Sequence, residues 1–156
     1  ELMKRMEIRG IDTAYVTMHT GLGCFREIDV EDLTKHKMDS DLISVDTEAV
    51  QLVNNAKAEG RRICAVGTSV QRVLETATLT GGMLKEYDGW TSKFIFPEYE
   101  FHVANCMIAN FYAPYSTMLM LTTAFGGYDN VMNAYQVALD EGYRFGLYGD
   151  AMLIID

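Results

Sequence analysis

The sequence is poor in the residues that mark disulfide-bonded and metal-binding proteins. It has only three cysteines, Cys24, Cys64 and Cys106, which are widely spaced and never arranged as Cys-x-x-Cys. That number and spacing exclude a disulfide framework and the common zinc-binding patterns, and they suit a reducing cytosol. The three histidines form no recognisable ligand set with the cysteines. We therefore expect no metal site.

Positive charge and long apolar runs are also scarce. The 13 lysines and arginines are outnumbered by 22 aspartates and glutamates, which gives a formal net charge of −9. A protein that coats a nucleic-acid backbone should be basic, so this class is excluded, whereas a local RNA contact is not. Apolar blocks such as residues 118–121 are far too short to span a bilayer, and no signal peptide is visible. We expect no membrane partner.

What the sequence does contain is ordinary for a globular protein. Apolar residues make up 49% and charged residues 22% of the 156 residues, which suits one domain, or part of one, with a sizeable core. The 10 methionines, 7 phenylalanines and 9 tyrosines make that core bulky and adaptable. Helical and extended patterns alternate along the chain. We therefore predict an α/β fold with a mainly parallel or mixed sheet flanked by helices.

Apolar spacing and turn residues predict the individual elements. Residues 79–93 form the longest stretch predicted to be irregular, and residues 29–34 are predicted to make a helical turn. Asp129 is expected to cap the last helix, and Gly10 and Gly60 to end the first two. Helices are expected at residues 1–9, 47–59, 68–75, 117–125 and 129–139, and strands at residues 11–18, 42–45, 63–66, 94–96, 106–109, 143–148 and 151–155.

The segment from residue 63 to residue 75 organises the rest of the chain. Its apolar start predicts a strand buried on both faces, Gly67, Thr68 and Ser69 break the strand, and a helix follows. The carboxyl end of such a strand is where α/β proteins bind ligands, and the helix start, helped by Arg72, suits an anion. Alternatively, Thr68 or Ser69 caps the helix while Arg72 pairs with Glu75 in solvent. The segment lacks the lysine of a Walker A loop.

A polar segment at residues 36–41 is dense in titratable groups. In a turn, the Asp39 carboxylate would orient the His36 imidazole and raise its pKa, which would make His36 a better base. The alternative that the spacing leaves open is a solvated hairpin.

Three further polar features could bind a ligand. His19 precedes a loop in which Gly21 and Gly23 form a Gly-x-Gly pattern, although a dinucleotide fingerprint would have a third glycine in place of Arg26. Asn110 beside Phe111 could recognise the edge of a base, or it could tie down its own loop. Asp150 could present a carboxylate at the end of a strand, or it could form part of a turn.

Five long blocks, in order, carry a resemblance to a known family. They are His-Thr-Gly-Leu-Gly-Cys-Phe at 19–25, His-Lys-Met-Asp-Ser-Asp at 36–41, Ala-Val-Gly-Thr-Ser-Val-Gln-Arg-Val-Leu-Glu at 65–75, Ala-Asn-Phe-Tyr-Ala-Pro-Tyr-Ser-Thr-Met-Leu-Met at 109–120, and Ala-Phe-Gly-Gly-Tyr-Asp-Asn-Val-Met-Asn-Ala-Tyr at 124–135. Tyr-Arg-Phe at 143–145 and Tyr-Gly-Asp-Ala-Met-Leu-Ile at 148–154 follow the last block. Over essentially its whole length the chain resembles the S-adenosylmethionine:tRNA ribosyltransferase-isomerase family of queuosine biosynthesis.

The resemblance implies a cytoplasmic bacterial tRNA-modifying enzyme. Such an enzyme moves the ribosyl part of S-adenosylmethionine onto 7-aminomethyl-7-deazaguanine at the wobble position of tRNAs with G-U-N anticodons, and the product is epoxyqueuosine. It also implies that residues 1–156 are the C-terminal part of an α/β catalytic domain, whose missing N-terminal half carries a glycine-rich segment and a β-barrel domain. The chain by itself is therefore expected to be inactive.

The resemblance also assigns roles to residues, with three departures from the usual family pattern. The chain has Asp39 and Tyr112 where the family usually has histidine, and one threonine fewer at Thr68. Two alternatives remain open: a non-catalytic or truncated fragment that binds nucleoside or RNA, and a generic nucleotide-binding oxidoreductase domain, which the broken Gly-x-Gly pattern disfavours. The expected catalytic residues are His36, Asp39, Glu75 and Tyr112, and the expected substrate-binding residues are His19, Gly21, Gly23, Gly67, Thr68, Ser69, Arg72, Asn110, Phe111 and Asp150.

Overall fold

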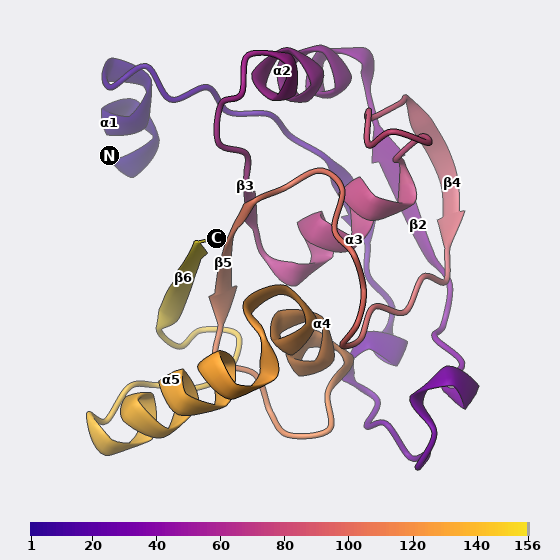
Figure 1. Cartoon of the computed structure of the whole chain (residues 1–156), viewed down its shortest axis with the longest axis vertical. Helices are drawn as coiled ribbons and strands as arrows, with labels where there is room; N and C mark the ends of the chain where they lie inside the picture. Colours follow the sequence, from indigo (N-terminus) through magenta and orange to yellow (C-terminus); the bar gives the residue numbers. More distant parts are fainter. Residues whose placement is uncertain (156) are drawn as a thin grey trace.

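A computed structural model describes residues 1–155 of the chain. It contains two three-stranded sheets with helix α3 (Thr68–Thr76) between them, as Figure 1 shows. Helix α3 contacts strands of both sheets, and six of its nine residues are buried. The segment that the sequence analysis places at the centre of the chain therefore lies at the centre of the fold.

The first sheet is antiparallel and has the order β1–β2–β4. It consists of β1 (Thr17–His19), β2 (Asp41–Val45) and β4 (Tyr87–Thr91). β2 alternates buried and half-buried residues along its length, as a strand with one face on the core should. β4 lies within residues 79–93, so the prediction that this stretch is irregular was wrong. Asp88 and Gly89 have low strand propensity, and pairing with β2 outweighs that local preference.

The second sheet has the order β3–β5–β6 and is mixed. β3 (Cys64–Val66) runs parallel to β5 (Cys106–Asn110), and β6 (Ala151–Ile155) runs antiparallel to β5. Of the two alternatives predicted, the structure therefore takes the mixed sheet flanked by helices. The prediction that β3 is buried on both faces was wrong, since Cys64 and Val66 are exposed and only Ala65 faces the core.

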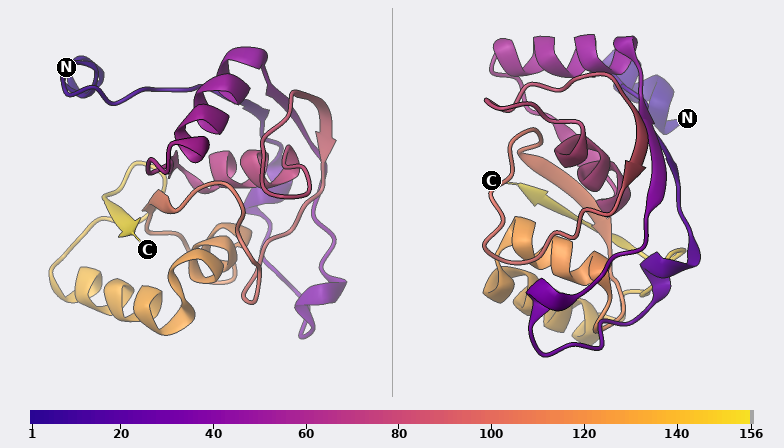
Figure 2. Two further views of the ribbon diagram at one scale, coloured as in Figure 1. Left: turned by 45° about the horizontal axis from the view of Figure 1, so that its top comes forward. Right: turned by 90° about the vertical axis from the view of Figure 1, so that its right-hand side faces the viewer.

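Residues 1–155 form four α-helices besides α3, and the caps of three of them test the predicted boundaries. Asp46 caps α2 (Thr47–Ala58) by accepting the Ala49 amide at 2.9 Å, and Ser116 caps α4 (Thr117–Gly126) through the Leu119 amide at 3.1 Å. The predicted cap of α5 (Tyr128–Asp140) was wrong, because Gly127 is its N-cap and Asp129 lies within the first turn. Helix α1 (Leu2–Ile8) has no buried residue and stands apart from the rest, as Figure 2 shows.

Several short elements differ from those expected. Residues 94–96 and 143–148 are not strands, and Phe94 instead packs on Phe96 with ring centroids 5.1 Å apart. The extended segment predicted at 11–18 is a strand only in β1. Two 3₁₀ turns, η1 (Leu22–Phe25) and η2 (Leu33–Lys35), occupy the Gly-x-Gly loop and the end of the predicted helical turn at 29–34.

The hydrophobic core fills the space between the two sheets. Ile43 from β2, Val73 from α3 and Met107 from β5 are fully buried there. Burying a side chain of this size contributes about 1.5–3 kcal/mol relative to leaving it exposed. The core thus fixes β5 and α3 firmly, and both elements lead directly into the candidate site.

Candidate functional site

A cavity of about 340 Å³ lies where β3 and β5 end and helices α3 and α4 begin. In α/β proteins, ligands bind at the carboxyl ends of parallel strands, and β3 and β5 are the parallel pair of this fold. The lining is mainly apolar, with a few polar groups from Thr68, Ser69 and Asn110. Its apolar wall consists largely of three methionines and three aromatic residues, Met18, Met38, Met118, Phe25, Phe94 and Tyr112.

The start of α3 contributes backbone donors to this cavity. Gly67 is its N-cap and has φ of +101°, a conformation that residues with a side chain rarely adopt. No side chain caps the helix, so the alternative that the Thr68 or Ser69 hydroxyl caps it was wrong. Within the described residues, the amides of Thr68, Ser69 and Val70 have no acceptor. These donors, together with the helix dipole, favour an anion at this end of the cavity.

Arg72 braces the cavity wall rather than pairing in solvent. Its Nη1 lies 2.6 Å from Asp41 Oδ2, and both side chains are at most 5% exposed. Its Nε and Nη2 donate to the carbonyls of Lys93 at 2.9 Å and Thr91 at 3.0 Å. The alternative of a solvent ion pair with Glu75 was therefore wrong. The predicted role in binding an anion is also not supported, because the guanidinium donors are directed at protein oxygens.

Glu75 is a buried structural carboxylate and does not line the cavity. It accepts hydrogen bonds from the amide of His102 at 2.9 Å, the amide of Val103 at 3.2 Å and the hydroxyl of Tyr99 at 3.0 Å. Burial, followed by the negative charge of Glu75, raises the pKa of Tyr99. The side chain of Glu75 is fully buried. The prediction that it is catalytic is therefore not supported, since it ties α3 to the segment that precedes β5.

His36 and Asp39 do not form the predicted pair. Asp39 instead lies 3.5 Å from the guanidinium of Arg26 and packs directly against Gly23. The imidazole of His36 packs on Phe94, with ring centroids 4.6 Å apart. The segment does not form the turn that the pairing requires, and each side chain instead finds a partner on a different neighbouring segment. His36 therefore lies behind the cavity wall that Phe94 forms.

The end of β5 brings two predicted residues to the cavity and turns a third away from it. Tyr112 and Asn110 line it, and the Tyr112 hydroxyl accepts from Thr68 Oγ1 at 3.4 Å. Phe111 is buried against Tyr135, whose hydroxyl accepts the Tyr112 amide at 2.8 Å. Burial raises the pKa of Tyr135 to about 12, so this hydroxyl stays protonated. The prediction that Phe111 binds substrate is therefore not supported.

The remaining predicted residues support the site from outside. The Gly21 amide donates to Asp41 Oδ1 at 2.8 Å, and His19 is exposed on β1. The Asp150 carboxylate accepts from the Arg144 amide at 2.8 Å, and this hydrogen bond holds the pKa of Asp150 below its usual range. The Asp150 carbonyl accepts from Asn110 Nδ2 at 3.1 Å. None of these contacts places His19, Gly21 or Asp150 in the cavity lining.

Sequence reasoning missed several lining residues. Cys24 is buried in the wall, and burial, together with the negative charge of Asp41, raises the pKa of its thiol. Thr117 and Met118 start α4, and Leu147 comes from the segment before β6. No spacing in the sequence links these residues, because they come from segments that only the fold brings together.

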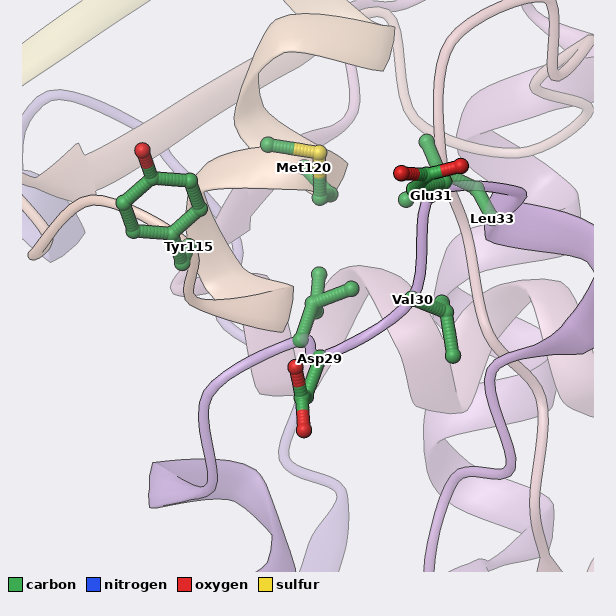
Figure 3. Close-up of a pocket in the computed structure, with 7 residues that line it drawn as sticks. Asp29, Val30, Glu31, Leu33, Tyr115 and Met120 are labelled. Atoms are coloured by element: carbon green, nitrogen blue, oxygen red, sulfur yellow. The ribbon is translucent and has the colours of Figure 1, made fainter.

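A second groove, of about 490 Å³, lies between residues 28–33 and the start of α4. Figure 3 shows Tyr115 and Met120 on one side of it, with Asp29, Glu31 and Leu33 on the other. It is lined by none of the residues that the sequence assigns to the site, and by no residue of β3, β5 or α3. We therefore place the candidate site in the first cavity.

Neither a metal cluster nor a membrane span is found in the part of the chain that the structure describes. Among residues 1–155, no group of three His, Cys, Asp or Glu side chains is placed to hold a metal ion. No helix in the same range is long and apolar enough to cross a membrane.

The fold and cavity together define an α/β protein with a cavity of small-ligand size at the ends of two parallel strands. The sequence profile described as "Queuosine biosynthesis protein" matches residues 1–154. The chain therefore belongs to the queuosine biosynthesis protein family, as its sequence blocks indicated.

Individual relatives agree with this assignment. The chain is 69% identical to the S-adenosylmethionine:tRNA ribosyltransferase-isomerase of Phocaeicola vulgatus and 50% identical to that of Cytophaga hutchinsonii. These matches cover 100% and 99% of this chain, but 44% of each relative. The crystal structure of S-adenosylmethionine tRNA ribosyltransferase from Thermotoga maritima matches with a TM-score of 0.80 and 37% identity, over 99% of this chain and 48% of that one. The chain thus spans less than half the length of these relatives.

Proposed function

We propose that the protein is an S-adenosylmethionine:tRNA ribosyltransferase-isomerase and that the cavity between α3 and α4 holds S-adenosylmethionine. The reaction transfers the ribosyl part of this substrate to 7-aminomethyl-7-deazaguanine at the wobble position of a tRNA with a G-U-N anticodon. Ring rearrangement gives epoxyqueuosine, with adenine and methionine released. Membership of the family supports this function ahead of the fragment and oxidoreductase alternatives.

The observation that carries the proposal is the uncapped start of α3 beside an apolar cavity of suitable size. A volume of about 340 Å³ lies within the range of sites for small organic ligands. The free amides of Thr68 and Ser69 suit the methionine carboxylate. The rings of Phe25 and Phe94 suit the sulfonium, since a cation is attracted to an aromatic face.

Proton transfer to or from the substrate requires side chains that reach the cavity. The sulfonium acidifies the carbon beside it, so a base can form an ylide, and adenine must leave with a proton or a hydrogen bond. Of the four expected catalytic residues, Tyr112 is the one in the cavity lining. Its hydroxyl, beside Thr68, is placed to give or take a proton. His36 lies one aromatic ring away, behind Phe94.

The greater length of the relatives supports the proposal that this chain is one part of a longer enzyme. We propose that residues 1–156 are the C-terminal part of the α/β catalytic domain, and that an N-terminal half with a glycine-rich segment and a β-barrel completes it. The chain covers 44% of the relatives, which leaves ample length for both. The complete protein acts on tRNA in the cytoplasm.

Replacing Ser69 with tryptophan tests the binding site. Ser69 is exposed, lines the cavity and makes no side-chain hydrogen bond in the described residues, so the fold should survive the change. The indole would occupy the space next to the free α3 amides. We expect S-adenosylmethionine to bind the full-length protein about 10- to 100-fold more weakly, as isothermal titration calorimetry can measure.

Thr80→Trp is the matched control, because Thr80 is also exposed but lies outside the cavity lining. It should bind S-adenosylmethionine as the unmodified protein does. Equal affinity for Ser69→Trp and Thr80→Trp would contradict the assignment of the cavity.

A further inference from the structure

Two rigid turns present large apolar side chains to solvent at the mouth of the cavity. Leu22 and Phe25 of η1 are 86% and 55% exposed, and Leu147 and Tyr148 are 54% and 99% exposed. Phe25 and Leu147 also line the cavity. In the right-hand view of Figure 2, η1 and the segment before β6 lie along the same edge of the molecule. We call Leu22, Phe25, Leu147 and Tyr148 the rim.

The first turn owes its exposed pair to 3₁₀ geometry. In a 3₁₀ helix, residues three apart lie on the same side, so Leu22 and Phe25 both face outward. Cys24 faces inward, is buried, and donates its thiol hydrogen to the Gly21 carbonyl at 3.2 Å. The Gly21 amide is in turn fixed by the buried carboxylate of Asp41 at 2.8 Å. The burial of Cys24 and these two hydrogen bonds therefore fix the turn to the core.

The second turn is closed by bonds between its two ends. The Asp150 amide donates to the Arg144 carbonyl at 2.8 Å, and the Arg144 amide donates back to the Asp150 carboxylate at 2.8 Å. The Gly146 amide is bound to the Phe111 carbonyl at 2.8 Å. A Cβ at Gly149 would collide with the Arg144 carbonyl, so the backbone there is closely packed. Tyr148 thus stands on a well-fixed loop without packing against the fold itself.

We propose that the rim is a stacking surface for the unpaired RNA bases that flank the base being modified. This inference rests on the proposed function. An aromatic side chain has few torsions, so on a fixed backbone it loses little entropy when a base stacks on it, and stacking tolerates any base because each has a π-face. Single-stranded loops are also where proteins read RNA, because their bases can be splayed apart.

The charges around the rim favour RNA over another apolar partner. Arg26, next to Phe25 in the chain, and Arg144, at the base of the second turn, have side chains that are 69% and 76% exposed. Each forms one ion pair open to solvent, with Asp39 at 3.5 Å and with Asp150 at 3.2 Å. Exposed guanidinium groups near a stacking surface suit phosphates and bases. The net charge of −9 opposes broad binding of the RNA backbone. Local stacking at the cavity mouth needs no such basic surface.

The test compares Tyr148→Ala with Tyr148→Trp and Tyr128→Ala in the full-length protein. Tyr128 is also an exposed tyrosine, at the start of α5 and outside the cavity lining. The probe is an RNA hairpin whose single-stranded loop carries 7-aminomethyl-7-deazaguanine next to 2-aminopurine, a base whose fluorescence reports stacking. We expect Tyr148→Ala to weaken hairpin binding about 5- to 100-fold and to reduce the fluorescence change. Tyr148→Trp and Tyr128→Ala should bind as the unmodified protein does.

An abasic nucleotide in place of 2-aminopurine sharpens the comparison, because it removes the stacking partner from the RNA. The unmodified protein should lose affinity for the abasic hairpin, and Tyr148→Ala should lose little more. Tyr148→Ala that binds the intact hairpin as tightly as Tyr128→Ala does would overturn the stacking surface, even if the protein modifies tRNA. If the unmodified protein stacks on the RNA base but transfers no ribosyl group, the rim proposal holds and the proposed function is refuted instead.

Discussion

Replacing Asp41 with alanine is expected to lower the free energy of unfolding by about 3–5 kcal/mol, because it leaves the Arg72 guanidinium buried without a counter-charge. The two side chains are 3% and 5% exposed, and their charged atoms lie 2.6 Å apart. The same change removes the acceptor of the Gly21 amide. Chemical denaturation of the full-length protein measures the loss.

Asp12→Ala is the matched control for this ion pair. Asp12 lies 2.9 Å from Arg61, but these side chains are 58% and 42% exposed. Solvent screening limits such a pair to about 0–1 kcal/mol. If Asp41→Ala cost no more than Asp12→Ala, the buried brace would not hold the β1–β2–β4 sheet and α3 together as described.

Removing the Tyr112 hydroxyl is expected to lower kcat/KM for tRNA modification by about 10²- to 10⁴-fold, the usual contribution of a positioned acid or base. Tyr112→Phe keeps the ring and its packing, and the Tyr112 amide that binds Tyr135 is unchanged. S-adenosylmethionine should still bind. Adenine release by the full-length protein in the presence of tRNA measures the rate.

Tyr115→Phe separates the cavity from the second groove. Tyr115 is three residues away, 69% exposed, and lines that groove instead. Its change should leave the rate as it is. A loss of activity in Tyr115→Phe combined with full activity in Tyr112→Phe would move the chemistry to the groove shown in Figure 3.

Local sequence signals predicted most of the fold. Helices with clear caps, such as α2 behind Asp46 and α4 behind Ser116, were found within a few residues of their ends. β4 was missed because Asp88 and Gly89 have low strand propensity. These residues form a strand because they pair with β2, a contact that the local sequence does not show. The exposure of Val66 was missed for a similar reason, since an apolar run does not say whether anything covers its second face.

The site was predicted less well than the fold. Strand–turn–helix order pointed to the end of β3 and the start of α3, and the family resemblance pointed to Tyr112; all three lie at the cavity. Glu75 and Arg72 were misread, because the sequence does not show that one helix turn separates two different buried networks. A signal for the Arg72 brace was nevertheless present. Asp41 shares the inward face of β2 with Ile43 and Val45, and a carboxylate there requires a buried partner.

The complex of the full-length protein with S-adenosylmethionine, solved by crystallography, tests the central claim most directly. The account predicts the methionine carboxylate within hydrogen-bond distance of the Thr68 and Ser69 amides, with the sulfonium among the aromatic rings of the cavity. Tyr112 should lie beside the ribose. Density for the substrate in the groove between Ile28 and Tyr115, with the ends of β3 and β5 empty, would contradict the account.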